Sequence, residues 1–246
     1  MNRILIASPT AAVKNYCTEQ WLLHLNTLTY IYGFDVVLVD NTPDKGENIS
    51  YLNELIKSLP LKFKAWAVGA TFSKKASLFK RMCAAHQACA DFAKEYGFKH
   101  MLHLESDVFP ESNVIEKLLE NHKKVCGALY YRDAGVNRRL MVQRHIYRAH
   151  NNIMSENFKP GDDVIFIDGK TKEVAHVGLG CVLIHTSVFE KIKFRFKKGS
   201  TMSVDSYFAE DCMRAGIKIY ADTSLICRHE DSIEVWNDLV SQKVIE

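Results

Sequence analysis

The stretch His100-Met101-Leu102-His103-Leu104-Glu105-Ser106-Asp107 joins a short run rich in apolar residues to two acids. Such a run, after a glycine that ends a helix, is typical of a buried strand. Residues two apart in an extended chain point to the same side, so Glu105 and Asp107 face one ligand. Two hard oxygen donors at a strand end suit Mg2+ or Mn2+, and such a cation also binds a diphosphate.

The chain before this stretch alternates strands and helices. The predicted strands cover 4–7, 36–39 and 63–68, and the predicted helices cover about 21–32, 49–56 and 73–96. Continuous apolar strands separated by helices predict an α/β fold, with a mainly parallel central sheet and helices on both faces. Ligands of such sheets bind beyond the carboxyl ends of the strands. We therefore expect the chemistry at Ser8-Pro9, Asp40-Asn41 and Glu105-Ser106-Asp107.

The rhythm of the sequence changes after about residue 130. The segment 132–158 is polar and is predicted to be irregular, and 164–168 and 173–177 are predicted to form a hairpin around Gly169-Lys170. Further strands are predicted at 181–184, 217–220 and 226–229, and a helix at about 205–215. No repeat or linker divides the chain.

Three features of this second half could carry chemistry. Gly178 and Gly180 precede a buried strand, where they permit close approach of a ligand or simply form a tight turn. Asp205 begins a helix, where an acid is either a cap or a functional group. Glu210 and Asp211 lie on the same helix and compete for any catalytic role.

His229 follows an apolar strand beside Glu230. A lone histidine is usually structural or exposed, so a ligand role needs partners from elsewhere in the chain.

The charge of the chain is informative only locally, because its 246 residues carry a net charge of +3. Between Arg132 and His150 there are five arginines against one acid. These arginines are Arg132, Arg138, Arg139, Arg144 and Arg148. A second basic cluster covers 191–198. Such stretches either bind phosphate groups or form a solvated basic surface.

The seven cysteines are odd in number, widely spread and without a C-x-x-C pair, so the sequence indicates neither a zinc knuckle nor a disulfide framework. Cys83, Cys89, Cys181 and Cys227 lie in apolar surroundings and are predicted to be buried thiols, as in a reducing compartment. No signal peptide and no transmembrane segment is expected, so we expect a cytoplasmic protein, in the host cytoplasm if the protein is viral.

Taken in order, these motifs resemble the GT-A glycosyltransferases, particularly the bacterial and viral members similar to the large inverting family. The matching segments are 104–110, 178–184, 205–208 with 216–219, and His229. The resemblance implies a Rossmann-like GT-A fold in a single catalytic domain over 1–246. Residues 1–130 would bind the nucleotide-sugar and residues 131–246 the acceptor.

The resemblance also implies roles for individual residues. It implies a metal site for Mn2+ or Mg2+ at Glu105, Asp107 and His229, and Asp205 as the catalytic base. It implies donor contacts from Pro9, Thr10, Asp40, Arg81, Glu105, Ser106, Gly178 and Gly180. Two positions depart from the family pattern: Glu105 stands where the family has Asp, and Val204 precedes Asp205 where the family has Glu. The first departure affects how the metal is held, and the second affects which acid is the base.

The expected reaction is transfer of a sugar from a nucleotide-sugar donor, UDP-linked, to an acceptor hydroxyl with inversion. The arginine-rich stretch is compatible with an anionic acceptor, such as a glycan, a lipid carrier or a modified nucleic acid. A viral enzyme that glycosylates a DNA base is one alternative, and it would need an extruded base or single-stranded DNA.

Two further alternatives lie outside the glycosyltransferases. A metal-dependent nucleotidyltransferase usually has a glycine-rich loop after its first strand, and 8–12 contain no glycine. A binding module without activity would leave the spaced acids and His229 unexplained.

Overall fold

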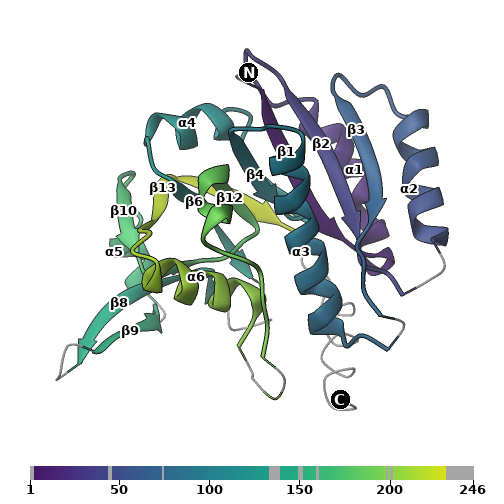
Figure 1. Ribbon diagram of the computed structural model, residues 1–246. Helices are drawn as coiled ribbons and strands as arrows, with labels where there is room; N and C mark the ends of the chain where they lie inside the picture. The colour runs from purple at the N-terminus through teal and green to yellow at the C-terminus, as the bar shows by residue number, and fades with distance from the viewer. Residues whose placement is uncertain are drawn as a thin grey trace.

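The computed structural model describes residues 3–43, 46–73, 75–132, 139–148, 152–158, 161–197, 199 and 202–230, with the backbone alone for 146–148 and 152–154. The elements of the first half are β1 (Ile4–Thr10), η1 (Ala12–Lys14), α1 (Asn15–Leu25), β2 (Phe34–Asp40), α2 (Glu47–Ser58), β3 (Lys64–Gly69), α3 (Leu78–Glu95), β4 (His100–Leu104), β5 (Val108–Phe109), α4 (Val114–Glu120) and β6 (Val125–Arg132). The elements of the second half are β7 (Arg139–Leu140), β8 (Val142–Arg148), β9 (Asn152–Asn157), α5 (Asp162–Phe166), β10 (Thr171–Val174), β11 (His176–Val177), β12 (Cys181–His185), η2 (Thr186–Glu190), α6 (Val204–Arg214) and β13 (Ile219–His229). Their arrangement is shown in Figure 1.

A ten-stranded mixed sheet runs through the described part of the molecule, and its main order is β10-β13-β6-β12-β4-β1-β2-β3. The strands β3, β2, β1 and β4 are parallel, whereas β12 runs antiparallel between β4 and β6. A separate three-stranded sheet has the order β11-β8-β9. The predicted α/β fold with a mixed central sheet is therefore confirmed, and its parallel pairs are β1 with β2, β1 with β4, β2 with β3, and β6 with β13.

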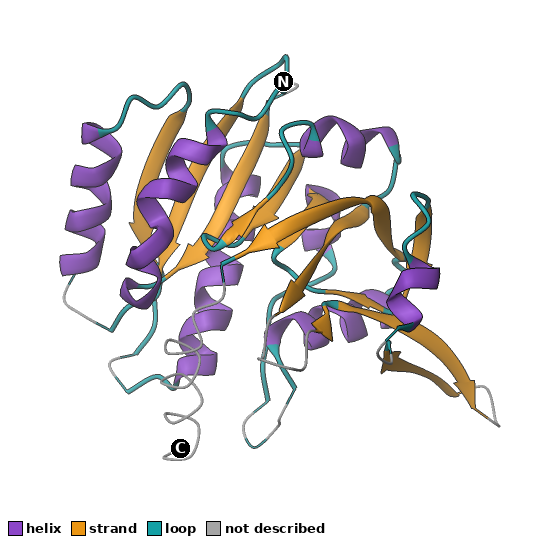
Figure 2. Cartoon of the chain, turned by 180° about the vertical axis from the view of Figure 1, so that it is seen from behind, coloured by secondary structure: helices purple, strands orange, loops and turns teal. Residues whose placement is uncertain are grey.

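Helices cover both faces of the central sheet, as Figures 1 and 2 show from opposite sides. Alternate residues of β1 reach opposite faces because the strand period is two. Ile4 and Ile6 belong to the core with Trp21 of α1, whereas Leu5 and Ala7 belong to the core with Cys89 of α3. This two-sided burial explains why the first strands are continuous apolar runs in the sequence.

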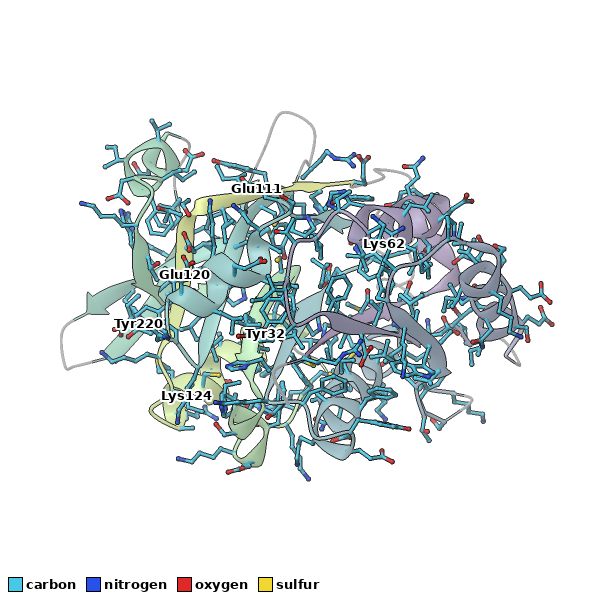
Figure 3. All side chains as sticks on the ribbon, turned by 90° about the horizontal axis from the view of Figure 1, so that it is seen from above. Tyr32, Lys62, Glu111, Glu120, Lys124 and Tyr220 are labelled. Carbon is cyan, nitrogen blue, oxygen red and sulfur yellow. The ribbon has the colours of Figure 1, made fainter. Side chains whose placement is uncertain are left out.

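The strands β10 and β3 form the two edges of the central sheet. In the view from above, Lys62 beside β3 and Tyr220 in β13 lie near its opposite ends (Figure 3). The parallel strands bring Thr10 and Asp40 directly opposite each other at the ends of β1 and β2. The carboxyl end of β4 lies beside that of β1.

One helix boundary in the first half differs from the prediction. The helix predicted to continue to Tyr32 ends at Leu25, and Gly33 instead lies in a separate turn with φ of 70°. Asn26 explains the early end, because its side chain donates to Pro60 O and accepts from Lys62 N. These bonds attach the chain to the loop before β3 in place of another helical turn.

Three predictions in the second half were wrong. The segment predicted to be irregular contains the hairpin β8–β9, and β6 precedes it where no strand was predicted. The hairpin predicted around Gly169 does not form: Gly161 starts α5, and β10 pairs with β13 instead. The strands predicted at 217–220 and 226–229 are one strand, β13, with an irregularity between Asp222 and Ile226.

All seven cysteines are buried and free, which confirms the predicted buried thiols. Among the described residues, no helix combines the length and the apolar character that crossing a membrane requires.

Candidate functional site

The three loops predicted to carry chemistry meet at the carboxyl ends of β1, β2 and β4. Thr10 Oγ1 lies 3.0 Å from Ser106 Oγ, and the Asn41 amide donates to Thr10 O at 2.9 Å. Pro9, Thr10 and Ser106 are buried at this junction. These segments therefore lie side by side, and their contact with a donor stays a prediction.

Asp40 is held firmly at the end of β2. Its Oδ1 accepts from Asn48 Nδ2 at 2.8 Å, from Thr42 Oγ1 at 2.6 Å and from the Thr42 amide at 3.2 Å. The side chain is buried, so these bonds replace the water that a carboxylate would otherwise keep. The position of this acid is therefore fixed before any ligand binds.

Glu105 and Asp107 flank a tight turn after β4. The Glu105 amide donates to Gly180 O at 3.0 Å, and the Val108 amide donates to Glu105 O at 3.0 Å. Ser106 between them is fully buried, and its carbonyl oxygen accepts a hydrogen bond from Cys17 Sγ at 3.2 Å. The two acidic side chains lie close enough for one lysine, Lys14, to contact both, and their contact with a ligand stays a prediction.

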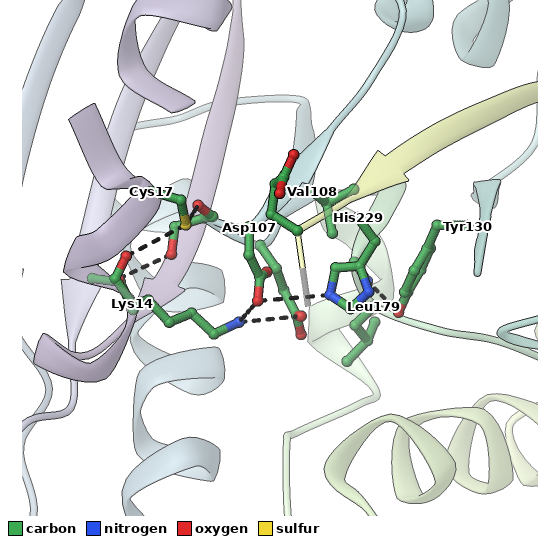
Figure 4. Close-up of polar contacts among 12 residues, drawn as sticks. Lys14, Cys17, Asp107, Val108, Tyr130, Leu179 and His229 are labelled. Carbon is green, nitrogen blue, oxygen red and sulfur yellow. Dashed lines mark hydrogen bonds and ion pairs between the residues drawn. The ribbon is translucent and has the colours of Figure 1, made fainter. Parts of the chain in front are cut away.

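Lys14 is the residue of this site that sequence reasoning missed. Its Nζ lies 2.6 Å from Asp107 Oδ2 and 3.6 Å from Glu105 Oε2 (Figure 4). It comes from η1, just after β1, and the available signal was a basic residue soon after the first strand of the sheet. That signal is weak alone, because lysines are frequent on loops.

His229 approaches Asp107 from the opposite side. Its Nε2 lies 3.6 Å from Asp107 Oδ2, and its Nδ1 lies 3.3 Å from Tyr131 O. Contact with the Tyr131 carbonyl on the Nδ1 side fixes the ring so that Nε2 faces Asp107, and metal-binding imidazoles are usually oriented in this way by a contact on their other nitrogen. The Glu230 amide also donates to Asp107 O at 2.8 Å, so the end of β13 is tied to the acidic turn.

The two acids differ in how readily they ionise. Burial alone would raise the pKa of Asp107, but Lys14 and His229 outweigh it and hold that pKa well below its ordinary value. Burial raises the pKa of Glu105, and Lys14 offsets this only in part. Asp107 is therefore the firmly charged member of the pair.

The donor types in this cluster suit a hard divalent cation. Asp107 Oδ1 is buried without a hydrogen-bond partner among the described residues, so one carboxylate oxygen has coordination capacity to spare. Glu105, Asp107 and His229 do not form a ready three-ligand group, however, and the described part of the chain holds no other group of three His, Cys, Asp or Glu that could. The ammonium of Lys14 lies between the carboxylates instead.

Asp205 lies in the first turn of α6, and Ser203 rather than Asp205 caps this helix. Asp205 Oδ2 lies 3.5 Å from Nε2 of His176, and the buried His176 has no hydrogen-bond partner on either ring nitrogen among the described residues. Burial would raise the pKa of Asp205, but contact with His176 outweighs it, so the pKa is lowered. Asp205 is consequently ionised over the whole neutral range.

The competing acids of α6 are occupied elsewhere. Asp211 Oδ2 lies 2.6 Å from Arg195 Nε, and Glu210 Oε2 lies 2.9 Å from Arg195 Nη2. Glu210 also pairs with Arg214 at 2.7 Å. These ion pairs balance both charges, which distinguishes Asp205 from its neighbours.

A cavity of about 410 Å³ lies between α6 and the small sheet, next to Asp205. We call it the α6 pocket. Its lining residues are Gln143, His145, Ser155, Ala175, His176, Met202, Ser206, Ala209, Glu210 and Met213. Most of the lining side chains are either apolar or polar without a charge. Such a lining is typical of pockets that orient a small ligand by a few hydrogen bonds.

Gly178 and Gly180 are explained by packing against one aromatic ring. A Cβ atom at either position would overlap the side chain of Tyr130. The Gly180 amide donates to Tyr130 Oη at 3.1 Å. Close approach does require glycine here, as predicted, but the approaching group in the structure is Tyr130.

Arg81 and two arginines of the arginine-rich stretch have polar partners in the structure. Arg81 Nη1 donates to Ala76 O at 3.0 Å, which attaches it to the loop before α3. Arg144 pairs with Glu156 at 2.6 Å and lies 3.6 Å from Asp162. Arg139 donates to Asn157. Arg138 and the side chain of Arg148 lie outside the described residues.

Comparison with known proteins agrees with this fold. The chain is similar to GalNAc-T7 in a crystal structure with UDP, GalNAc and Mn2+, with a TM-score of 0.62, 13% sequence identity, and coverage of 95% of this chain and 44% of that chain. The chain thus spans less than half the length of GalNAc-T7. It has a GT-A fold.

A crystal structure of A197 from STIV is also similar, with a TM-score of 0.45, 15% identity, and coverage of 94% of this chain and 87% of that one. No protein-family model and no curated protein sequence matches the chain.

Proposed function

We propose that the protein is a glycosyltransferase that moves a sugar from a UDP-linked donor to an acceptor hydroxyl. The observation that carries this proposal is the convergence of Glu105, Asp107 and His229 at the end of β4, on a GT-A fold with Asp205 at the start of α6. GalNAc-T7, crystallised with UDP, GalNAc and Mn2+, has a similar fold, which supports a nucleotide-sugar as the donor class.

The proposed metal ligands are Asp107, Glu105 and His229, for Mn2+ or Mg2+. When bound, such a cation supplies positive charge to the diphosphate as it leaves. Asp107 is the main ligand in this proposal because its pKa is held low and its Oδ1 has no other partner among the described residues. The ring of His229 is already oriented by Tyr131 O, which lowers the cost of binding.

Asp205 is the proposed general base. As the acceptor oxygen attacks the anomeric carbon, its proton passes to the Asp205 carboxylate and the bond from that carbon to the nucleoside diphosphate breaks on the opposite face. This single displacement inverts the anomeric centre. Because the pKa of Asp205 is lowered, the base is charged when the acceptor arrives but intrinsically weak, so close contact with the hydroxyl is required.

The donor is proposed to lie across the ends of β1, β2 and β4. Its proposed contacts are Pro9, Thr10, Asp40, Arg81, Glu105, Ser106, Gly178 and Gly180. In this arrangement residues 1–130 bind the donor and residues 131–246 bind the acceptor, within one catalytic domain.

The proposed place of the acceptor is the α6 pocket, because it adjoins Asp205. The arginine-rich stretch would add affinity for an anionic acceptor: a glycan, a lipid carrier or a modified nucleic acid. A cytoplasmic location, in the host if the protein is viral, is supported by the seven free cysteines, since thiols persist in reducing compartments.

The direct test is a screen of nucleotide-sugars with Mn2+ that measures release of the free nucleotide. We expect release from one donor, and loss of that release in Asp107→Asn. If no nucleotide-sugar loses its sugar under any metal condition, with or without added acceptors, the glycosyltransferase proposal is wrong.

A further inference from the structure

The ammonium of Lys14 and the proposed metal compete for the same carboxylates. Lys14 Nζ lies 2.6 Å from Asp107 Oδ2 and 3.6 Å from Glu105 Oε2. In Figure 4 it reaches Asp107 from the side of α1, while His229 reaches the same acid from β13. A cation bound to these acids would have to be close to Lys14 Nζ.

Two positive groups cannot share this position. Only 7% of the Asp107 side chain and 21% of the Lys14 side chain are exposed, so water screens their surroundings poorly. A divalent cation and an ammonium at contact distance would repel each other strongly. The cation can therefore bind Asp107 closely only when Lys14 withdraws, which its flexible four-carbon stem allows.

The position of Lys14 in the chain indicates where its charge would go. It follows the segment from Pro9 to Ala12 at the end of β1, and Thr10 of that segment contacts Ser106 of the acidic turn. A diphosphate bound at this junction would place negative oxygens within reach of Nζ. The ammonium would then exchange one anionic partner for another and would not become a buried unpaired charge.

We propose that Lys14 is a phosphate-binding residue of the donor site that pairs with Asp107 and Glu105 until the metal and the diphosphate bind together. This inference rests on the proposed function. It makes metal binding and diphosphate binding mutually dependent: the metal binds weakly alone, because it must displace Lys14, and more tightly once the diphosphate receives the ammonium.

The first test measures Mn2+ binding without nucleotide, by electron paramagnetic resonance of the free ion. Lys14→Met keeps the aliphatic stem and removes the charge, and Lys57→Met, exposed on α2, is the matched control. We expect Lys14→Met to bind Mn2+ on the order of tenfold more tightly than wild type, with Lys57→Met unchanged. Unchanged or weaker Mn2+ binding in Lys14→Met would overturn the proposal.

The second test measures binding of UDP and of uridine by calorimetry at saturating Mn2+. Lys14→Met should bind UDP on the order of tenfold more weakly and uridine equally well, because uridine has no phosphate for the ammonium. A lysine that only neutralised the acids would leave UDP affinity unaltered, and that result would also overturn the proposal.

Two measurements remain decisive if Lys14→Met does not fold. Lys14→Arg keeps the charge and should keep weak Mn2+ binding, so tighter binding in that variant counts against the proposal. In wild type, UDP should increase the affinity of the protein for Mn2+ and uridine should not. Equal effects of UDP and uridine on this affinity would contradict the proposal. Absence of Mn2+ binding in every variant would end this inference, whereas nucleotide release without metal would still support the glycosyltransferase.

Discussion

His86 and His103 form a buried imidazole pair, with Nδ1 of His86 2.8 Å from Nε2 of His103 and the two rings stacked. His103 Nδ1 in turn lies 2.6 Å from Leu179 O, between Gly178 and Gly180. Because α3 and β4 hold the pair, it connects the helix behind the sheet to the glycine-containing loop beside the acidic turn. At least one of the two rings must be neutral, since one of the two bonded nitrogens has to accept the proton that the other donates.

This pair predicts a loss of stability in mild acid. Burial lowers the pKa of His103 to about 4 and that of His86 well below its ordinary value. A lowered folded-state pKa means that the unfolded chain binds protons first, so stability is full above about pH 6.5 and falls as the pH drops toward 4. His103 alone accounts for roughly 3 kcal/mol over that window, from a shift of 6.5 to about 4.

The measurement is urea unfolding at pH 7.5 and at pH 5 for wild type and for His86→Leu/His103→Leu. Carboxylates also titrate in this range, so the difference between the two proteins isolates the histidines. We expect the double variant to lose less stability between the two pH values than wild type does. An equal loss in both would show that the pair does not control the acid response.

Metal dependence is expected to act through Asp107. Excess chelator should abolish transfer, and Mn2+ or Mg2+ should restore it, because the leaving diphosphate needs compensating charge. Asp107→Asn should lose most of the activity while keeping the circular dichroism spectrum of the wild type. Asp91→Asn, exposed on α3, is the matched control and should transfer normally. Full activity in excess chelator would contradict the metal proposal.

The packing of Tyr130 against Gly180 predicts a strong coupling between the two positions. Gly180→Ala puts a methyl group into the rigid Tyr130 ring, and such overpacking costs about 1–3 kcal/mol. Tyr130→Leu should remove most of that cost, so a double-mutant cycle in urea unfolding should show a favourable interaction between the two changes. Strictly additive effects would mean that the loop relaxes away from the ring.

The parts of the fold that sequence predicted are those with local causes. The strands β1 to β4 are continuous apolar runs between turns, and Glu105 and Asp107 follow one of them directly. The early end of α1 depends on Asn26 bonding to a loop that starts 34 residues later, which no local pattern records. β6 contains Gly127, which has low strand propensity, and is a strand because β12 and β13 flank it.

The candidate site was likewise predictable only where its features have local causes in the sequence. Its acidic residues follow one another along the chain in a pattern that sequence alone shows. The contact of Lys14 with Asp107 joins η1 to the end of β4 and is visible only in the folded structure. The pairing of Glu210 and Asp211 with Arg195, which distinguishes them from Asp205, is likewise a tertiary contact. Sequence could propose three acids on α6, and only packing separated them.

An anionic acceptor predicts steep salt dependence. If Arg138 and Arg139 neutralise acceptor charges, acceptor affinity should fall markedly between about 50 and 200 mM salt, because such contacts release counterions. Arg138→Ala/Arg139→Ala should weaken acceptor binding and flatten this dependence, with UDP affinity much less affected. Arg144→Ala is a useful comparison, since Arg144 is already paired with Glu156 and should matter less. Acceptor binding indifferent to salt would argue for an uncharged acceptor.

Asp205→Asn is expected to separate catalysis from folding and donor binding. Asparagine keeps the size of aspartate and much of its hydrogen bonding at the start of α6, so unfolding and UDP affinity should stay near those of wild type. Turnover should fall by roughly two to four orders of magnitude, because a positioned general acid or base usually accelerates the reaction by that factor. Glu210→Gln removes the charge that pairs with Arg195 and Arg214 but keeps the size of this side chain in the α6 pocket, so it should retain far more activity. Nuclear magnetic resonance of the first product should show the anomeric configuration opposite to that of the donor. Normal turnover in Asp205→Asn, together with an inactive Glu210→Gln or Asp211→Asn, would show that the base is another acid of α6. A product that keeps the anomeric configuration of the donor would exclude the single displacement, whichever acid is essential.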